Sequence, residues 1–227
     1  MSSLRLAANA KINLCLEVLG RRSDGYHELA TVFQSVALAD EVLEEPGITL
    51  TVAEGAAPAG PGNLCWDAAE AYQRLRGWPP GVSVHLRKQI PMGGGLGGGS
   101  ADAATALAAL REMDADPPVL EDLREIAARL GADVAFCLTG GTALGRGRGD
   151  DLTRLAPSPE CWVCLAKPEF AVSTAEAYGM LTPGDFTSGA KAVEVAERIG
   201  AAEPVAEWAH LVHNSFAAPL MRRWPVF

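Results

Sequence analysis

The spacing of hydrophobic residues predicts strands and helices along the whole chain. Near its start, polar or small residues alternate with Ile12, Leu14 and Leu16, which predicts a half-buried strand over residues 4–19. Further strands are expected over residues 29–38, 48–52, 82–90 and 162–167. Helical spacing predicts helices over residues 64–75, 101–113, 120–130, 174–180, 191–199 and 204–211. Asn63 is the expected N-cap of the first of these helices, and Gly131 the expected end of the third.

A glycine-rich stretch follows the strand predicted over residues 82–90. Six of the seven residues from Gly93 to Gly99 are glycine, and an alanine-rich helix comes directly after them. Glycine loses more conformational freedom on folding than any other residue, so such a density needs a compensating benefit. That benefit is a set of unobstructed backbone N–H groups near a helix N-terminus, which favour an anion. The stretch is therefore a candidate phosphate-binding loop, with Ser100 as helix N-cap and Asp102 in the first turn.

Two common phosphate-loop templates do not fit this stretch. A Walker loop ends in Gly-Lys-Ser/Thr, whereas here Ser100 follows Gly99 directly and no lysine intervenes. A dinucleotide fingerprint matches the glycines literally, but any run of glycine matches it by chance. The second strand that such a fold requires is missing, because Asp114 is followed by a proline-rich loop and another helix. The third possibility is a different glycine loop that wraps a nucleoside triphosphate.

Composition narrows the class of protein. The chain has 227 residues and a formal net charge of −9, which argues against non-specific binding to nucleic acid or to a membrane surface. With no apolar targeting stretch and no 18-residue apolar span, a cytoplasmic location is expected. The five cysteines are odd in number and irregularly spaced, so no disulfide framework is predicted. Cys161 and Cys164 are expected to be buried thiols of a strand rather than a redox or zinc pair.

Several polar residues stand out, but each has a structural explanation beside a functional one. Lys11 interrupts an apolar strand pattern, and Lys88 lies on the apolar face just before the glycines; either ammonium could simply reach water. Asp133 in an apolar run is a helix N-cap or a carboxylate kept in a half-buried site. Tyr26 and His27 belong to a predicted polar turn. This turn is either an ordinary polar hairpin or a site where the two rings face a ligand.

Two features bear on domain organisation. Residues 140–149 form a second glycine concentration, which is expected to be a turn between strands. Composition changes over residues 150–159, a candidate domain boundary.

Three motifs together carry a resemblance to a known family. Pro91–Ala101, hereafter the glycine loop, resembles the phosphate-binding loop of the galactokinase/homoserine kinase/mevalonate kinase/phosphomevalonate kinase superfamily. Within it, residues 10–14 (Ala-Lys-Ile-Asn-Leu) and 20–29 (Gly-Arg-Arg-Ser-Asp-Gly-Tyr-His-Glu-Leu) are similar to the 4-diphosphocytidyl-2-C-methyl-D-erythritol kinase family, as is Gly-Ala-Asp-Val at 131–134. The motifs stand in the family's order and cover residues 4–149, with weaker similarity onward to Asn214.

The resemblance implies an α+β fold of two domains. A ribosomal protein S5-like N-terminal domain would span residues 1–152, and a smaller α/β domain would span residues 153–227. The family has a third glycine-rich motif near its C-terminus, and this sequence has nothing like it. We therefore expect the C-terminal domain to be incomplete.

The resemblance also implies a reaction and its residues. ATP would phosphorylate the 2-hydroxyl of the cytidine diphosphate-linked methylerythritol, a step of non-mevalonate isoprenoid biosynthesis. Asp133 would accept the hydroxyl proton, and Lys11 beside it would stabilise negative charge. Asn13 would orient the substrate. Tyr26 would stack on the cytosine and His27 would hydrogen-bond its edge, with Tyr178 a weaker candidate for the other ring face.

ATP would be held mainly by backbone N–H groups. The residues expected to bind it are Lys88, Asn63, Pro91, Met92, Gly93, Gly94, Gly95, Leu96, Gly97, Gly98, Gly99, Ser100 and Ala101. Mg²⁺ is expected with ATP, but no dedicated carboxylate cage is found, so phosphates and water would hold the ion.

Two other functions remain open at this stage. The chain could be a non-catalytic nucleotide-binding relative that lost its chemistry with the third motif. It could also be a sister kinase acting on a different small alcohol, although the adjacent Tyr26 and His27 favour a cytosine site.

Overall fold

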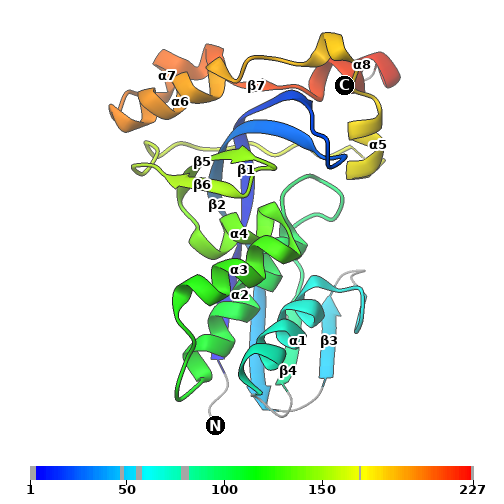
Figure 1. Ribbon diagram of the computed structural model, residues 1–227, viewed down its shortest axis with the longest axis vertical. Coiled ribbons are helices and arrows are strands. Elements are labelled where there is room, and N and C mark those ends of the chain that lie inside the picture. The colour runs from blue at the N-terminus through cyan, green and yellow to red at the C-terminus, as the bar shows by residue number, and fades with distance from the viewer. Residues whose placement is uncertain (1–3, 47–48, 55–57, 78–81, 169, 226–227) are drawn as a thin grey trace. The chain divides into compact units, whose positions relative to one another are not determined.

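The computed structural model describes residues 4–46, 49–54, 58–77, 82–168 and 170–225 (Figure 1). The strands are β1 (Leu4–Arg21), β2 (His27–Pro46), β3 (Thr49–Glu54), β4 (Val82–Arg87), β5 (Thr142–Gly147), β6 (Asp151–Arg154) and β7 (His213–Asn214). The α-helices are α1 (Leu64–Arg76), α2 (Gly98–Met113), α3 (Leu120–Leu130), α4 (Ala132–Thr139), α5 (Thr174–Gly179), α6 (Ala190–Gly200), α7 (Val205–Trp208) and α8 (Ala217–Arg223). Two 3-10 turns are η1 (Pro183–Asp185) and η2 (Ala209–Leu211). None of the described helices has the length and apolar character needed to cross a membrane.

The chain forms two compact units that are interleaved in sequence. The first comprises Met1–Lys11 and Ser35–Gly140, and the second comprises Ile12–Gln34 and Gly141–Phe227. Strands β1 and β2 are 18 and 20 residues long, far longer than ordinary strands, so each contributes to both units. The domain boundary between residues 152 and 153 stays a prediction.

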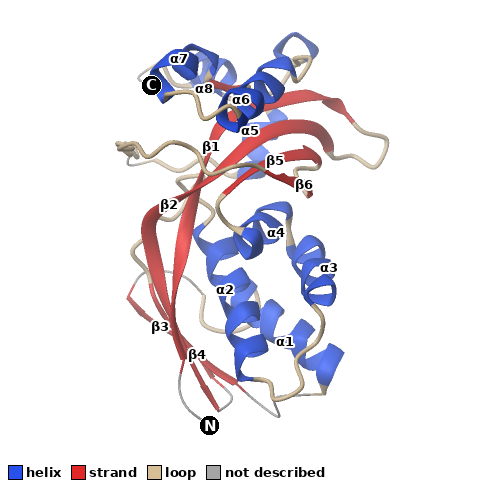
Figure 2. Cartoon of the chain, turned by 90° about the vertical axis from the view of Figure 1, so that its left-hand side faces the viewer, coloured by secondary structure: helices blue, strands red, loops and turns tan. Residues whose placement is uncertain are grey.

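In the first unit, β4 pairs antiparallel with the second half of β2, and β3 pairs parallel with β4. Helices α1 to α4 gather along one side of these strands (Figure 2). The small side chains of Ala101 and Ala106 let α2 approach the sheet closely. Their buried partners are Ala8, Val42, Cys65, Val84 and Leu86.

Helix α1 begins and ends as its sequence predicts. The Asn63 side chain accepts a hydrogen bond from the Cys65 N–H at 3.0 Å, which satisfies one free donor of the first turn. Gly77 ends the helix in the left-handed region, with φ of 65°. The predicted strand over residues 48–52 is β3 from Thr49 onward, while Ile48 lies outside the described residues, as do residues 55–57 of the loop that follows.

In the second unit, β5 pairs antiparallel with residues 29–34 of β2, β6 pairs antiparallel with β5, and β7 pairs parallel with β1. Helix α6 packs its apolar face on this sheet, and Trp208 of α7 is 1 % exposed beside it. The buried residues of this core are Cys15, Ala30, Val32, Leu144, Ala192, Val195, Ala196, Ile199, Trp208 and Leu211.

The structure corrects the prediction for the second glycine concentration. Residues 142–147 form strand β5, and the turn that follows, between β5 and β6, covers only residues 148–150. A Cβ on Gly145 would lie 2.9 Å from the Phe33 ring and 3.2 Å from the Thr31 methyl group, so the glycine allows close cross-strand packing.

A second correction concerns residues 162–167, which are not a strand. Cys161 and Cys164 are exposed, and Trp162 is fully exposed. A continuous apolar run cannot form a strand without a hydrogen-bonding neighbour, and no described strand pairs with this segment.

A third correction concerns the start of α2. The helix begins at Gly98 with Gly97 as its N-cap, and no side chain caps it, so Ser100 lies inside the first turn rather than at the N-cap. Gly97 has φ of 69°, a conformation that glycine adopts without strain, which lets the helix start earlier than the side chains suggest. Asp102 is buried and does not face solvent at the helix end.

Candidate active site

Lys11 and Asp133 meet in the first unit, although they lie far apart in the sequence. Lys11 Nζ is 3.1 Å from Asp133 Oδ2; the lysine side chain is 8 % exposed and the aspartate side chain 38 %. Gly131 is the N-cap of α4 and no side chain caps this helix, so Asp133 does not serve as its cap. The arrangement is a buried cation facing a carboxylate that a ligand can reach.

The glycine loop packs directly on Lys11. The Lys11 N–H donates a hydrogen bond to the Leu96 carbonyl oxygen at 2.9 Å, and Leu96 is 8 % exposed. Gly97 has φ of 69°, and a Cβ there would lie 2.9 Å from Lys11 Cγ. Glycine is therefore required at residue 97 for two reasons, the backbone conformation and the contact with lysine.

A pocket of about 180 Å³ lies within the glycine loop, lined by Lys88, Ile90 and residues 91–99. It sits at the N-terminus of the 16-residue helix α2, where the helix dipole and unhindered backbone N–H groups favour an anion. A larger hollow in the second unit, of about 640 Å³, is lined by Glu194, Glu197 and Glu203. Its one lining cation, Arg198, is already paired with Glu194 and Glu203, so the net negative charge of the hollow repels phosphate and the loop pocket is the candidate nucleotide site.

Lys88 does line this pocket, but its ammonium group is engaged elsewhere. It contacts the carboxylates of Asp40 and Asp102, whose side chains are 0 % and 2 % exposed. Burial alone would lower the pKa of Lys88, but the two carboxylates outweigh it and raise that pKa. Burial raises the pKa of Asp102 to about 7 in spite of the lysine.

Sequence reasoning missed Asp40. No motif contains it, and the one signal was a carboxylate at the end of an apolar run. Asn63 uses its side chain to cap α1 and to donate to the Pro58 carbonyl oxygen at 2.8 Å. The nucleotide-binding roles of Asn63 and Lys88 stay predictions.

The predicted cytosine-binding residues all lie in the second unit. His27 stacks on Tyr178, with ring centroids 4.7 Å apart, and Tyr178 meets Phe216 edge-on at 4.9 Å. Burial, with a smaller contribution from the charge of Arg21, lowers the pKa of His27, so its ring is neutral at pH 7 and offers one donor and one acceptor.

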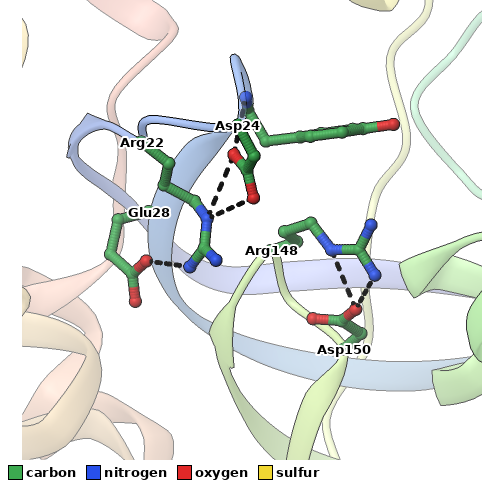
Figure 3. A network of polar contacts seen from close by, with 6 residues as sticks. Arg22, Asp24, Glu28, Arg148 and Asp150 are labelled. Carbon is green, nitrogen blue, oxygen red and sulfur yellow. Dashed lines mark hydrogen bonds and ion pairs between the residues drawn. The ribbon is translucent and has the colours of Figure 1, made fainter.

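Tyr26 is 57 % exposed, and the Arg148 guanidinium lies over its ring at 5.2 Å from the centroid. Arg148 is held in turn by Asp150, with its Nε 3.1 Å from Asp150 Oδ2 (Figure 3). Asn13 donates a hydrogen bond to Thr31 Oγ1 at 2.7 Å.

The turn that carries Tyr26 and His27 is fixed by polar contacts. Arg22 binds Asp24 at 3.1 Å and Glu28 at 2.5 Å (Figure 3). Asp24 Oδ1 accepts the Tyr26 N–H at 3.1 Å, and the Tyr26 carbonyl accepts the Arg22 N–H at 2.8 Å. The backbone N–H and the carbonyl group of Tyr26 are thus both hydrogen-bonded, which fixes the backbone that carries its ring.

The described residues include no group of three or more His, Cys, Asp or Glu side chains placed to hold a metal ion.

Comparison with known proteins shows the family to which the chain belongs. Residues 63–141 match the family model described as GHMP kinases N terminal domain. The chain resembles a crystal structure of 4-(cytidine 5'-diphospho)-2C-methyl-D-erythritol kinase with a TM-score of 0.78 and 37 % identity, covering 98 % of this chain and 79 % of that one. A homoserine kinase from Cytophaga hutchinsonii, 20 % identical with a TM-score of 0.68, shares the fold.

Two curated relatives carry the name 4-diphosphocytidyl-2-C-methyl-D-erythritol kinase. The one from Geobacter sulfurreducens is 39 % identical over 230 residues, covering 100 % of this chain and 80 % of the relative. The one from Moorella thermoacetica is 50 % identical over 181 residues, 78 % of this chain, and that match spans 63 % of the relative's length. The chain belongs to the 4-diphosphocytidyl-2-C-methyl-D-erythritol kinase family.

Proposed function

We propose that this protein is an ATP-dependent kinase that phosphorylates the 2-hydroxyl of 4-diphosphocytidyl-2-C-methyl-D-erythritol. The observation that carries the proposal is the contact of Lys11 with both Asp133 and the glycine loop. A phosphate-binding loop and a carboxylate able to accept a hydroxyl proton are thereby joined through one buried cation. Phosphoryl transfer depends mainly on positioning and charge neutralisation, which this arrangement supplies.

In the proposed reaction, Asp133 accepts the proton of the attacking hydroxyl as the new O–P bond forms. The bond from the γ-phosphorus to the bridging oxygen breaks, and ADP leaves with the bonding electrons. Lys11 lies 3.1 Å from Asp133 and balances the negative charge that develops on the attacking and transferred oxygens. Its low exposure strengthens this electrostatic effect, because little water screens it.

ATP would be held by backbone N–H groups of the glycine loop and by the dipole of α2. Phosphate oxygens and water, rather than protein carboxylates, would hold Mg²⁺, whose charge would offset part of that of the phosphates.

The cytidine moiety would be recognised in the second unit. The neutral His27 ring offers the donor and acceptor pattern that a cytosine edge needs, and Tyr26 and Tyr178 offer faces for stacking. Asn13 would orient the reacting sugar alcohol. A cytoplasmic location also remains our proposal.

The test is turnover of ATP and the cytidyl substrate by the purified chain. Asp133→Asn should lower kcat by about 10²–10⁴-fold, the usual contribution of a positioned base, while ATP still binds. Asp122→Asn is the matched control, because Asp122 lies in the first turn of α3 as Asp133 does in α4, and it should leave kcat unchanged.

The outcomes separate this proposal from the alternatives. ATP binding without turnover by the unmodified chain would support the non-catalytic relative. Substantial turnover by Asp133→Asn would exclude this carboxylate as the base. Failure of CMP to compete with the substrate would contradict a cytosine-reading site and favour a different alcohol.

A further inference from the structure

The Asp40 side chain binds the short segment that connects β4 to the glycine loop. Its Oδ1 accepts hydrogen bonds from two successive backbone N–H groups, those of Gln89 and Ile90, the second at 2.7 Å. These residues immediately precede the loop. Its Oδ2 contacts the Lys88 ammonium group. The side chain is 0 % exposed, so these contacts are made without competition from water.

Asp40 also lies close to the point where the loop passes into α2. A Cβ added to Gly98, the first residue of that helix, would lie 3.4 Å from Asp40 Oδ2 and 3.1 Å from Ile90 Cγ2. Lys88 continues the link, because its ammonium group also contacts Asp102 within α2. The entry of the loop is therefore hydrogen-bonded to one carboxylate of β2, and Lys88 links that carboxylate to α2, which begins at the exit of the loop.

The chemistry of the site requires an aspartate. Both Asp40 oxygens accept, one from backbone N–H groups and the other from an ammonium group. An asparagine of the same shape would have to turn its NH₂ group either toward Lys88 or toward the two N–H groups. Either orientation opposes donors to donors in a buried site.

We propose that Asp40 is a positioning residue for ATP: it fixes the spacing between the two ends of the glycine loop so that the loop N–H groups converge on the phosphates. Asp40 touches no reacting group itself and acts through the loop. The inference rests on the proposed function in that the anion held by the loop is taken to be the ATP triphosphate.

The test is Asp40→Asn in the full chain, with steady-state kinetics in both substrates and amide hydrogen exchange. We expect the KM for ATP to rise on the order of tenfold, the effect of losing one charge-assisted hydrogen bond. The KM for the cytidyl substrate should stay within about twofold, because its proposed contacts do not depend on the loop. The amides of Gln89 and Ile90 should exchange faster than in the unmodified protein.

The matched control is Asp114→Asn. Asp114 is another buried carboxylate of the first unit, and its side chain is 5 % exposed. It accepts hydrogen bonds from Tyr72 and Arg76. This variant should lose stability but keep the unmodified KM for ATP and the slow exchange at Gln89 and Ile90. A purely structural role for Asp40 predicts that the two variants behave alike, and that result would overturn the proposal.

Two further outcomes are decisive. If Asp40→Asn does not fold, amide hydrogen exchange in the unmodified protein decides. The proposal is overturned if the amides of Gln89 and Ile90 exchange as fast as the amide of Met92, which is exposed. Slower exchange at Gln89 and Ile90 than at Met92 supports the proposal. If the unmodified chain neither binds nor turns over ATP, the proposed function fails. The exchange comparison between the two variants then still decides whether Asp40 fixes the loop.

Discussion

Gly97→Ala tests the contact on which the proposed site depends. Gly97 has φ of 69°, where an alanine costs roughly 1–2 kcal/mol of strain. Its new Cβ would also lie 2.9 Å from Lys11 Cγ and 3.1 Å from Lys11 Cε. Carbon atoms normally approach to about 3.5–4.0 Å, so the lysine stem or the loop must move by about 0.5–1 Å. Cγ is close to the backbone of β1, so the stem cannot simply swing away.

Gly95→Ala is the matched control for this substitution. Gly95 also has φ of 69°, but a Cβ there meets no atom within 4 Å. Both variants should therefore lose about 1–2 kcal/mol in the free energy of unfolding, measured by urea denaturation. The difference between them isolates the displacement of Lys11.

The expected difference appears in kcat, measured by ADP release at saturating ATP and cytidyl substrate. A catalytic group displaced by about 1 Å can cost on the order of 100-fold in rate, so Gly97→Ala should be about 10–100-fold slower than Gly95→Ala. Equal kcat values in the two variants would refute the idea that Lys11 must be held against the loop for the reaction.

Two further predictions concern the second unit and the thiols. The pKa of His27 is lowered from 6.5, so the folded protein favours the neutral ring. The free energy of unfolding and the affinity for the cytidyl substrate should therefore be highest above pH 6.5 and should fall as the pH drops below 6.5. A pH profile of KM checks this, and His27→Gln should flatten it; an unchanged profile would count against His27. With a thiol reagent, Cys161 and Cys164 should react rapidly in the native protein, whereas Cys15, which is buried with its pKa raised to about 12, should react only on unfolding. Rapid reaction of Cys15 would contradict its burial.

Local features of this protein could be read from its sequence because local chemistry decides them. The cap at Asn63, the end of α3 at Gly131 and the strand character of β1 follow from side-chain capping, glycine conformations and hydrophobic period. The glycine loop was equally visible, since only an unusual backbone needs so many glycines.

Predictions from the sequence were wrong where the structure of a segment depends on pairing with another segment that is distant in the chain. The sequence predicted a turn over residues 140–149 and a strand over residues 162–167, yet among the described strands only residues 142–147 have pairing partners, in β2 and β6. Glycine in β5 served close packing on Phe33 instead of a turn. Strand formation is a property of pairs of segments, and a single segment does not specify its partner.

For the candidate site, too, the sequence determined some features and the tertiary structure determined others. The sequence determined which residues were suited to phosphate and proton chemistry, because the motifs place a cation, a carboxylate and a glycine loop in one chain. Only the tertiary structure decided that Lys11 lies against both Asp133 and Gly97, and that Asp40 accepts the backbone N–H groups of the two residues that precede the loop. Those contacts join four segments that are remote in sequence, and the register of the strands and the packing of α2 and α4 bring them together.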